Sequence, residues 1–153
     1  MNLERNMKVE TDKIAILVKS LALEFDKFAN PILLTYNLTP TQYKVLKYLY
    51  NNDNVIGLDI QNAFSMTNPS VTGILQNMEN GGWITRNTNP NDSRSKIIIL
   101  TDKALKLKEE LYVIGEDLEN AFTESLNKEE YEQLKKLLNK LLYNIKNLGG
   151  NNE

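Results

Sequence analysis

Residues 68–80 predict a helix whose outward face carries uncharged side chains that can hydrogen-bond with DNA. Thr67 can cap the first turn, and the glycine pair at 81–82 ends the helix. When the apolar residues of this stretch face a core, the outward positions are Thr72, Gly73, Gln76 and Asn77. Asn68 and Ser70 add polar groups in the first turn. In a major groove, Gln76 can pair with an adenine edge and Thr72 can touch a thymine methyl; the alternative is a solvated polar face.

A β-hairpin is predicted next, with strands at residues 83–86 and 96–100 joined by a polar, asparagine-rich loop. Asp92 and Arg94 lie in this loop two residues apart, so the carboxylate can orient the guanidinium. An arginine held in this way can enter a narrow A·T minor groove, where the negative potential is strong. A surface salt bridge of little energetic value is the alternative.

The helix and hairpin together are electrically neutral. Residues 56–100 hold three basic side chains (Arg86, Arg94, Lys96) and three acidic ones (Asp59, Glu79, Asp92), in a chain of net charge −2. Residues 101–126 hold seven acidic side chains and three lysines, so most of the acid lies outside the helix and hairpin. We therefore expect few phosphate contacts and modest non-specific affinity for DNA. Arg86 is equally consistent with a strut for the hairpin and a phosphate contact, and Lys96 is a further candidate contact.

The ordered motifs of this region resemble the winged helix of the MarR (multiple antibiotic resistance regulator) family. They are a glycine–hydrophobic–hydrophobic–x–arginine strand at 82–86, an aspartate–x–arginine tip at 92–94 and a leucine–threonine exit at 100–101. The resemblance implies a DNA-binding transcription regulator whose N- and C-terminal helices form a dimer interface. Gly73 and Gly81 depart from the arginine and lysine common in relatives. Gly73 removes one cation but permits close approach of the helix to DNA.

Long helices with apolar stripes are predicted at both ends of the chain. The first runs from about residue 9 to 34, and Pro31 is expected to kink it or end it near residue 30. The last begins at an Asn127 cap and ends at the glycine pair 149–150. The stripes are Ile14, Val18, Leu21, Phe25, Phe28 and Ile32 in the first helix, and Tyr131, Leu134, Leu138, Leu141, Ile145 and Leu148 in the last. Their width favours packing against a second copy over an intramolecular bundle. A two-fold dimer would place two recognition helices about 34 Å apart, one turn of duplex DNA.

Further helices are predicted between these ends. One covers residues 39–50, with Thr39 and Gln42 forming a capping box around Pro40. A short helix at 57–65 and the helix at 68–80, separated by a tight turn, match a helix-turn-helix. A fifth helix is predicted from a Thr101 cap to about residue 122.

An aromatic cluster is expected where the terminal helices meet the winged helix. Its candidate ligand-pocket residues are Phe28, Tyr36, Tyr43, Leu46, Lys47 and Tyr50, with Phe25 and Leu105 nearby. One interpretation is plain core. The other is an apolar pocket for a small aromatic acid, a ligand class that relatives bind in this cleft. A ligand that prefers one spacing of the recognition helices would shift the protein away from its DNA-binding form.

The chain has no cysteine and no histidine. This composition excludes a disulfide framework and thiol-based redox sensing, and it removes the commonest zinc and haem ligand. We expect no metal, no cofactor and no catalytic residues, because no motif supplies a nucleophile with its base. No apolar run approaches the length of a membrane span and the N-terminus lacks an apolar signal core, so we expect a cytoplasmic protein with no membrane partner.

The sequence therefore predicts a mainly α-helical protein with a small β-hairpin, arranged as a winged helix-turn-helix with N- and C-terminal dimerisation helices. We assign residues 1–36 to the N-terminal dimerisation helix, 37–101 to the DNA-binding region, 102–148 to the C-terminal helices and 149–153 to a disordered tail, all in one structural domain. The predicted function is a homodimeric repressor on a pseudo-palindromic operator, released by a small aromatic or amphipathic ligand. The alternative is a dimeric ligand-sensing or protein-interaction module with weak or lost DNA binding, which the low local basicity motivates.

Overall fold

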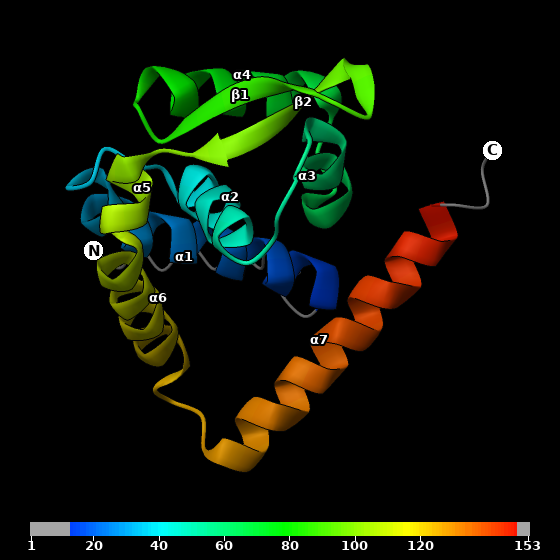
Figure 1. The fold of residues 1–153 in the computed structure, drawn as a ribbon. Coiled ribbons are helices and arrows are strands. Elements are labelled where there is room, and N and C mark those ends of the chain that lie inside the picture. Colours follow the sequence, from blue (N-terminus) through cyan, green and yellow to red (C-terminus); the bar gives the residue numbers. More distant parts are fainter. Residues whose placement is uncertain (1–12, 150–153) are drawn as a thin grey trace, which may run out of the picture. The chain divides into compact units, whose positions relative to one another are not determined.

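The computed structural model describes residues 13–149, which form a mainly α-helical chain with one β-hairpin (Figure 1). In chain order the elements are α1 (Ile14–Leu34), α2 (Pro40–Tyr50), α3 (Gly57–Phe64), α4 (Asn68–Asn80), β1 (Ile84–Asn89), β2 (Asp92–Leu100), α5 (Asp102–Lys106), α6 (Lys108–Thr123) and α7 (Lys128–Gly149). The chain divides into two compact units, with the boundary between Tyr112 and Val113. The first unit holds α2, α3, α4 and the antiparallel β1–β2 hairpin, which confirms the predicted winged helix-turn-helix.

Capping side chains define where the helices of this unit begin. Thr39 Oγ1 accepts a hydrogen bond from the Gln42 N–H at 3.2 Å, and Gln42 Oε1 accepts one from the Thr39 N–H at 3.0 Å. These two bonds are the predicted capping box, and Pro40 occupies the first helical position. Thr67 caps α4, as predicted, because its Oγ1 accepts a hydrogen bond from the Ser70 N–H at 3.4 Å. The starts of α2 and α4 are therefore set by residues within one turn of each helix.

The end of α4 is a Schellman motif. Gly82 has a φ of 75°, in the left-handed region that favours glycine. The Trp83 N–H donates to the Met78 carbonyl at 2.9 Å, and the Gly82 N–H donates to the Glu79 carbonyl at 3.0 Å. This pair of bonds satisfies carbonyls that the helix leaves unpaired and turns the chain directly into β1. The helix and the hairpin are thus joined without a flexible loop.

The hairpin is longer than predicted. The predicted strands stopped at residue 86 and resumed at residue 96, whereas β1 continues to Asn89 and β2 starts at Asp92. Asp92 and Arg94 therefore lie on β2 and not in a loop. Asparagine has low strand propensity, but residues 87–89 gain backbone pairing from β2, and this pairing outweighs the local preference. The hairpin with its two-residue turn is called the wing below.

A buried apolar core supports the recognition helix and the wing from below. Its largest fully buried side chains include Trp83, Leu46, Ile60, Met78 and Ile84. The segment before α3 also pairs with β2, because the Ile98 N–H donates to the Val55 carbonyl at 2.8 Å. Helix α4, helix α3 and the wing are therefore held by one shared core.

Helix α1 does not end at residue 30. It continues through Pro31 to Leu34, which confirms the predicted end at residue 34; of the two effects expected at Pro31, the early end is wrong. Proline removes one backbone hydrogen bond, while Ala29 and Leu33 on either side of it are buried and hold the last turn in place. The predicted residues 9–12 of this helix lie outside the described residues, as do residues 150–153 of the predicted tail.

The single helix predicted after Thr101 is wrong as well, because the chain forms α5 and α6 with a break at Leu107. Thr101 does cap α5, accepting a hydrogen bond from the Ala104 N–H at 3.3 Å. The Tyr50 hydroxyl donates to the Ala104 carbonyl at 2.6 Å. In a continuous helix this carbonyl would accept its hydrogen bond from the Lys108 N–H. A hydrogen bond from a distant helix therefore accompanies the break.

Helix α7 begins at the predicted Asn127 cap, where Asn127 Oδ1 accepts from the Glu130 N–H at 3.0 Å and Glu130 Oε2 accepts from the Asn127 N–H at 2.9 Å. None of the side chains described for α7 is buried.

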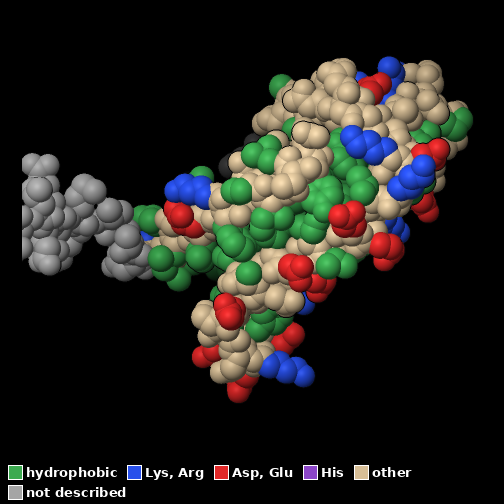
Figure 2. All heavy atoms as spheres, turned by 90° about the vertical axis from the view of Figure 1, so that its left-hand side faces the viewer, with side chains coloured by type: hydrophobic (Ala, Val, Ile, Leu, Met, Phe, Trp, Pro, Cys, Tyr) green, Lys and Arg blue, Asp and Glu red, His purple; other side chains and the backbone are tan. Residues whose placement is uncertain are grey.

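Large apolar side chains are also exposed elsewhere, and Figure 2 shows a group of them in the middle of one face with charged side chains around it. Among the described residues, no helix has the length and apolar character needed to cross a membrane.

Candidate nucleic-acid interface

The recognition helix α4 presents the predicted polar face to solvent. Val71, Leu75 and Met78 are buried, and Ile74 is half-buried. This arrangement leaves the predicted outward residues exposed: Asn68, Ser70, Thr72, Gly73, Gln76 and Asn77. The helical period of the apolar residues was therefore sufficient to identify the exposed face.

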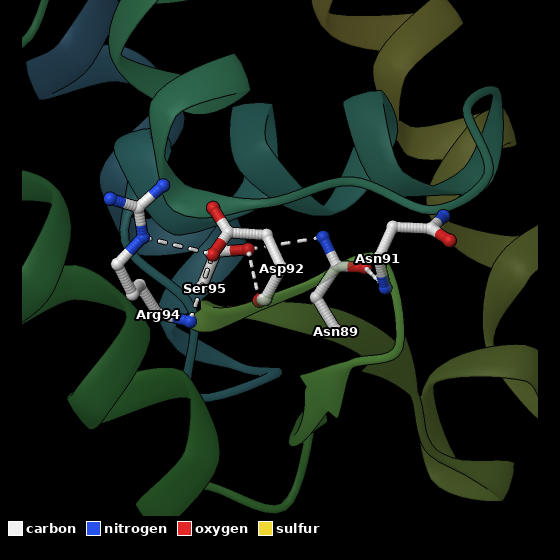
Figure 3. A network of polar contacts seen from close by, with 5 residues as sticks. All are labelled: Asn89, Asn91, Asp92, Arg94 and Ser95. Carbon is white, nitrogen blue, oxygen red and sulfur yellow. Dashed lines mark hydrogen bonds and ion pairs between the residues drawn. The ribbon is translucent and has the colours of Figure 1, made fainter.

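The wing tip is fixed by a short network of polar contacts (Figure 3). Asp92 Oδ1 accepts from the Arg94 backbone N–H at 3.0 Å and from Arg94 Nε at 3.1 Å. Asn89 Nδ2 donates to Ser95 Oγ at 3.0 Å, and Asn89 Oδ1 accepts from the Asn91 N–H at 3.0 Å. The Arg94 side chain is 90% exposed, so its guanidinium projects into solvent from an ordered base.

A bulge produces this geometry. Thr88 pairs with Lys96, but the next pair is Asn89 with Asp92, so residues 93–95 are extra on β2. The extra residues bring Ser95 back to Asn89 and turn Arg94 outward. Asp92 and Arg94 were predicted from sequence, but Asn89 and Ser95 were not; the asparagine before Pro90 was the available signal for a side-chain-stabilised turn.

Arg86 connects the wing to the recognition helix. It forms an ion pair with Glu79 at 2.7 Å, and its Nη2 donates to Gln76 Oε1 at 3.2 Å. The Arg86 side chain is 21% exposed, against 90% for Arg94. Of the two roles left open for Arg86, the contacts correspond to the strut. Glu79 had no assigned role from sequence, because its partner lies on another element.

A hollow of about 290 Å³ lies between the wing and the start of α4, and the three cations of the wing line it. Its lining includes Asn68, Thr72, Arg86, Arg94 and Lys96, half of the ten predicted contact residues. Two of the three cations have a carboxylate neighbour, Glu79 or Asp92. Of the remaining predicted residues, Asp92 lies on β2 and the other four lie on α4 between Ser70 and Asn77, so all ten belong to the helix and the wing.

Comparison with known proteins identifies the family of this chain. The family model described as MarR family matches residues 38–96. The transcriptional regulator FarR of Neisseria gonorrhoeae is 35% identical over 114 residues, which is 72% of this chain and 76% of FarR. The chain belongs to the MarR family. The multiple antibiotic resistance protein MarR of Escherichia coli K12 is 28% identical over 118 residues, 76% of this chain and 82% of that protein. The family is one of transcriptional regulators, not of enzymes.

Solved structures of MarR family members share the fold. A complex of MepR from S. aureus with DNA aligns with a TM-score of 0.80 and 30% identity, covering 86% of this chain and 98% of MepR. A mutant MarR from E. coli complexed with operator DNA aligns with a TM-score of 0.79 and 26% identity, covering 87% of this chain and 96% of that one. The likeness extends through nearly the whole length of both relatives.

The two glycines that depart from the common MarR family residues occupy different surroundings. A Cβ added at Gly73 would meet nothing within 4 Å, so the position is open on the outward face of α4. A Cβ added at Gly81 would lie 3.1 Å from Trp83 Cδ1 and 3.3 Å from the Asn77 carbonyl oxygen. Gly81 is therefore packed against the buried indole, whereas nothing in the protein itself requires glycine at Gly73.

Gly73→Ala is expected to raise the free energy of unfolding by about 0.5–1 kcal/mol, because glycine weakens a helix interior and the new methyl group meets no neighbour. Urea denaturation would measure the gain. Gly82→Ala is the matched control and should lower the stability, since Gly82 has a φ of 75°. If Gly73→Ala is more stable yet binds operator DNA less tightly, the helix backbone approaches DNA at this position. A loss of stability at Gly73 would contradict the open surroundings.

The candidate ligand-pocket residues bring three phenol groups to one segment of the first unit. The hydroxyl of Tyr36 donates to Glu110, that of Tyr43 to the Leu111 carbonyl at 2.9 Å, and that of Tyr50 to the Ala104 carbonyl. Leu46 is fully buried and Phe28 is exposed. Lys47 Nζ lies 5.8 Å from the Tyr43 ring centroid and 5.5 Å from that of Tyr112. The phenols thus tie α2 and the turn after α1 to residues 104–111.

The pKa values of Tyr50 and Tyr36 are both raised, for different reasons. Burial raises the pKa of Tyr50 to about 12. The hydrogen bond to Glu110 raises the pKa of Tyr36, because ionisation would place two negative charges side by side. Both hydroxyls are therefore neutral donors at physiological pH. Among the described residues, no three carboxylates lie close enough together to hold a metal ion.

Proposed function

We propose that the protein is a cytoplasmic, homodimeric repressor that binds a pseudo-palindromic operator. Each subunit would place α4 in the major groove and Arg94 in the adjacent minor groove. The exposed polar face of α4, next to a wing tip that projects an arginine from an ordered base, carries this proposal. Relatives with the same fold have been solved in complex with DNA, which supports it. Occupation of a promoter by such a dimer would block transcription.

The proposed dimer uses the apolar stripes of α1 and α7. The five leucines and isoleucines of the α7 stripe, together with Leu137, are 41–62% exposed. A soluble chain rarely exposes a continuous stripe of this size without a partner. A two-fold dimer fits because a pseudo-palindrome presents two equivalent half-sites.

A fluorescence-anisotropy titration against the DNA upstream of its own gene tests the proposal directly. Tight binding at two chains per duplex, resistant to a scrambled duplex of equal length, is the expected result. Affinity should fall steeply with salt, because phosphate contacts release counterions. Equal binding to both duplexes would contradict sequence-specific recognition at this site.

Arg94→Ala should weaken operator binding by about 1–3 kcal/mol, or roughly five- to 150-fold, and leave the stability unchanged. The stability should not change, because the Arg94 side chain is 90% exposed and its ion pair joins it only to Asp92, two residues away at the wing tip. Arg94→Lys keeps the charge but loses the planar fork, so it should restore only part of the affinity. Affinity and salt slope both unchanged in Arg94→Ala would remove the wing from the interface.

We further propose that a small aromatic or amphipathic ligand releases the DNA by competing for the phenol hydrogen bonds. The hydroxyls of Tyr36, Tyr43 and Tyr50 donate hydrogen bonds to residues 104–111. A ligand carboxylate that accepted a hydrogen bond from one of these hydroxyls would therefore weaken its attachment to residues 104–111. Release of labelled operator by small aromatic acids in the same titration is the expected result. A ligand that bound the protein without shifting the titration would contradict this mode of release.

A further inference from the structure

Four polar side chains join the recognition helix to the wing in one chain of hydrogen bonds. Glu79 Oε2 accepts from Arg86 Nε at 2.7 Å, and Arg86 Nη2 donates to Gln76 Oε1 at 3.2 Å. At the other end of the amide, Gln76 Nε2 donates to Asn80 Oδ1 at 3.1 Å. Gln76, Glu79 and Asn80 belong to α4 and Arg86 to β1, and these two elements lie side by side (Figure 1).

The direction of this chain fixes which way the Gln76 amide faces. A guanidinium has donors and no acceptor, so the end of the amide next to Arg86 must be the oxygen. The nitrogen then faces Asn80, whose amide oxygen accepts from it. A flipped amide would place N–H groups against the donors of Arg86, which is unfavourable. Glu79 maintains this arrangement by holding Arg86 in place through a charge-assisted bond.

The two anchors leave Gln76 half of its hydrogen-bonding capacity. An amide has two acceptor lone pairs and two N–H donors. Arg86 uses one lone pair and Asn80 uses one N–H, so one of each remains on an exposed side chain. One acceptor beside one donor is what adenine requires in the major groove, where its N6 amino group donates and its N7 accepts.

We propose that Arg86 and Asn80 are positioning residues that hold the Gln76 amide ready to recognise adenine, with Glu79 fixing Arg86. The inference rests on the proposed function, in which α4 enters the major groove. Arg86 acts here through Gln76 and not by touching DNA. The contact between Arg86 and Gln76 then both supports the wing and sets specificity. This explains why the Arg86 side chain turns toward α4 and is largely shielded from solvent.

The physical advantage is that the amide is ordered before DNA arrives. A free glutamine samples many rotamers, and fixing them on binding opposes association. A side chain held at both ends loses less freedom when it meets the base. Loss of either anchor should therefore reduce the discrimination between adenine and other bases, and should leave the affinity for scrambled DNA unchanged.

The test is a selection from a duplex library with one half-site randomised, read out as base preference at each position. Gln76→Ala identifies the base pair that Gln76 reads. Asn80→Ala removes one anchor at an exposed position without changing any charge, and Arg86→Lys keeps the charge but loses the planar fork that bonds Glu79 and Gln76 at once. Asn120→Ala, an exposed asparagine on α6, is the matched control. Thermal unfolding of each variant shows that the fold is retained.

Both anchor variants are expected to lower the preference for adenine roughly three- to tenfold at the base pair that Gln76→Ala affects. In a Gln76→Ala background the anchor substitutions should add nothing, because they act through the same side chain. If Gln76→Ala lowers the preference and the anchor variants do not, the inference is wrong while the proposed function stands. If Gln76→Ala has no effect, the inference falls together with the Gln76 contact. A wild-type protein that selects no sequence would overturn the proposed function itself.

Discussion

Leu141→Glu together with Ile145→Glu is expected to make the protein monomeric and to lower its operator affinity by a factor on the order of 10²–10⁴. Both side chains lie on the apolar stripe of α7 and are 47% and 62% exposed. Burying two carboxylates in a dimer interface is costly, whereas in a monomer they remain solvated. The affinity falls because a monomer engages one half-site, and the effective concentration that a linked second half-site provides is lost.

Sedimentation velocity gives the mass of the variant and anisotropy its affinity. Glutamate is a good helix former, so circular dichroism should show the same helical content. Tyr143→Glu is the matched control, because Tyr143 is 72% exposed and lies off the stripe of the same helix. A double variant that still sediments as a dimer would show that α7 does not form the interface. A monomeric wild type would refute the proposed dimer altogether.

The recognition helix was predictable because the signals that define it are local. Thr67 caps its start, Gly82 provides the left-handed residue after its end, and the apolar period identifies the buried face. Each signal acts between residues within one turn of helix, so residues that are close in the sequence are also close in space and the contact can be predicted from their spacing. The same holds for the Asn127 cap of α7 and for the pairing of Asp92 with Arg94 across two residues.

What the sequence did not reveal depends on contacts between distant segments. The break between α5 and α6 accompanies a hydrogen bond from Tyr50, 54 residues before its acceptor Ala104. The extension of β1 to Asn89 comes from backbone pairing with β2, which overrides the low strand propensity of asparagine. The link from Arg86 to Gln76 joins a strand to a helix, and only the closure of the wing against α4 creates it.

Trp83→Ala is expected to lower the free energy of unfolding by about 3–5 kcal/mol, because it opens a large cavity in the core below the wing. Trp83 is 1% exposed and is the largest fully buried side chain of the described chain. It lies at the junction that orients the interface, since its N–H closes the end of α4 and its carbonyl accepts from Thr101 at 3.1 Å. Lys103 Nζ lies 4.3 Å from the ring centroid and donates to the Gly81 carbonyl, covering the indole.

Trp83→Phe separates packing from hydrogen bonding at this position. The indole Nε1 is buried and has no hydrogen-bond partner among the described residues, so phenylalanine sacrifices no bond and loses only volume. It should therefore cost much less than alanine in urea denaturation. At temperatures where Trp83→Ala is still folded, its operator affinity should also fall, because α4 and the wing share this support. Equal stability losses for phenylalanine and alanine would mean that the indole is held by an unrecognised polar contact and that cavity formation is not the dominant cost.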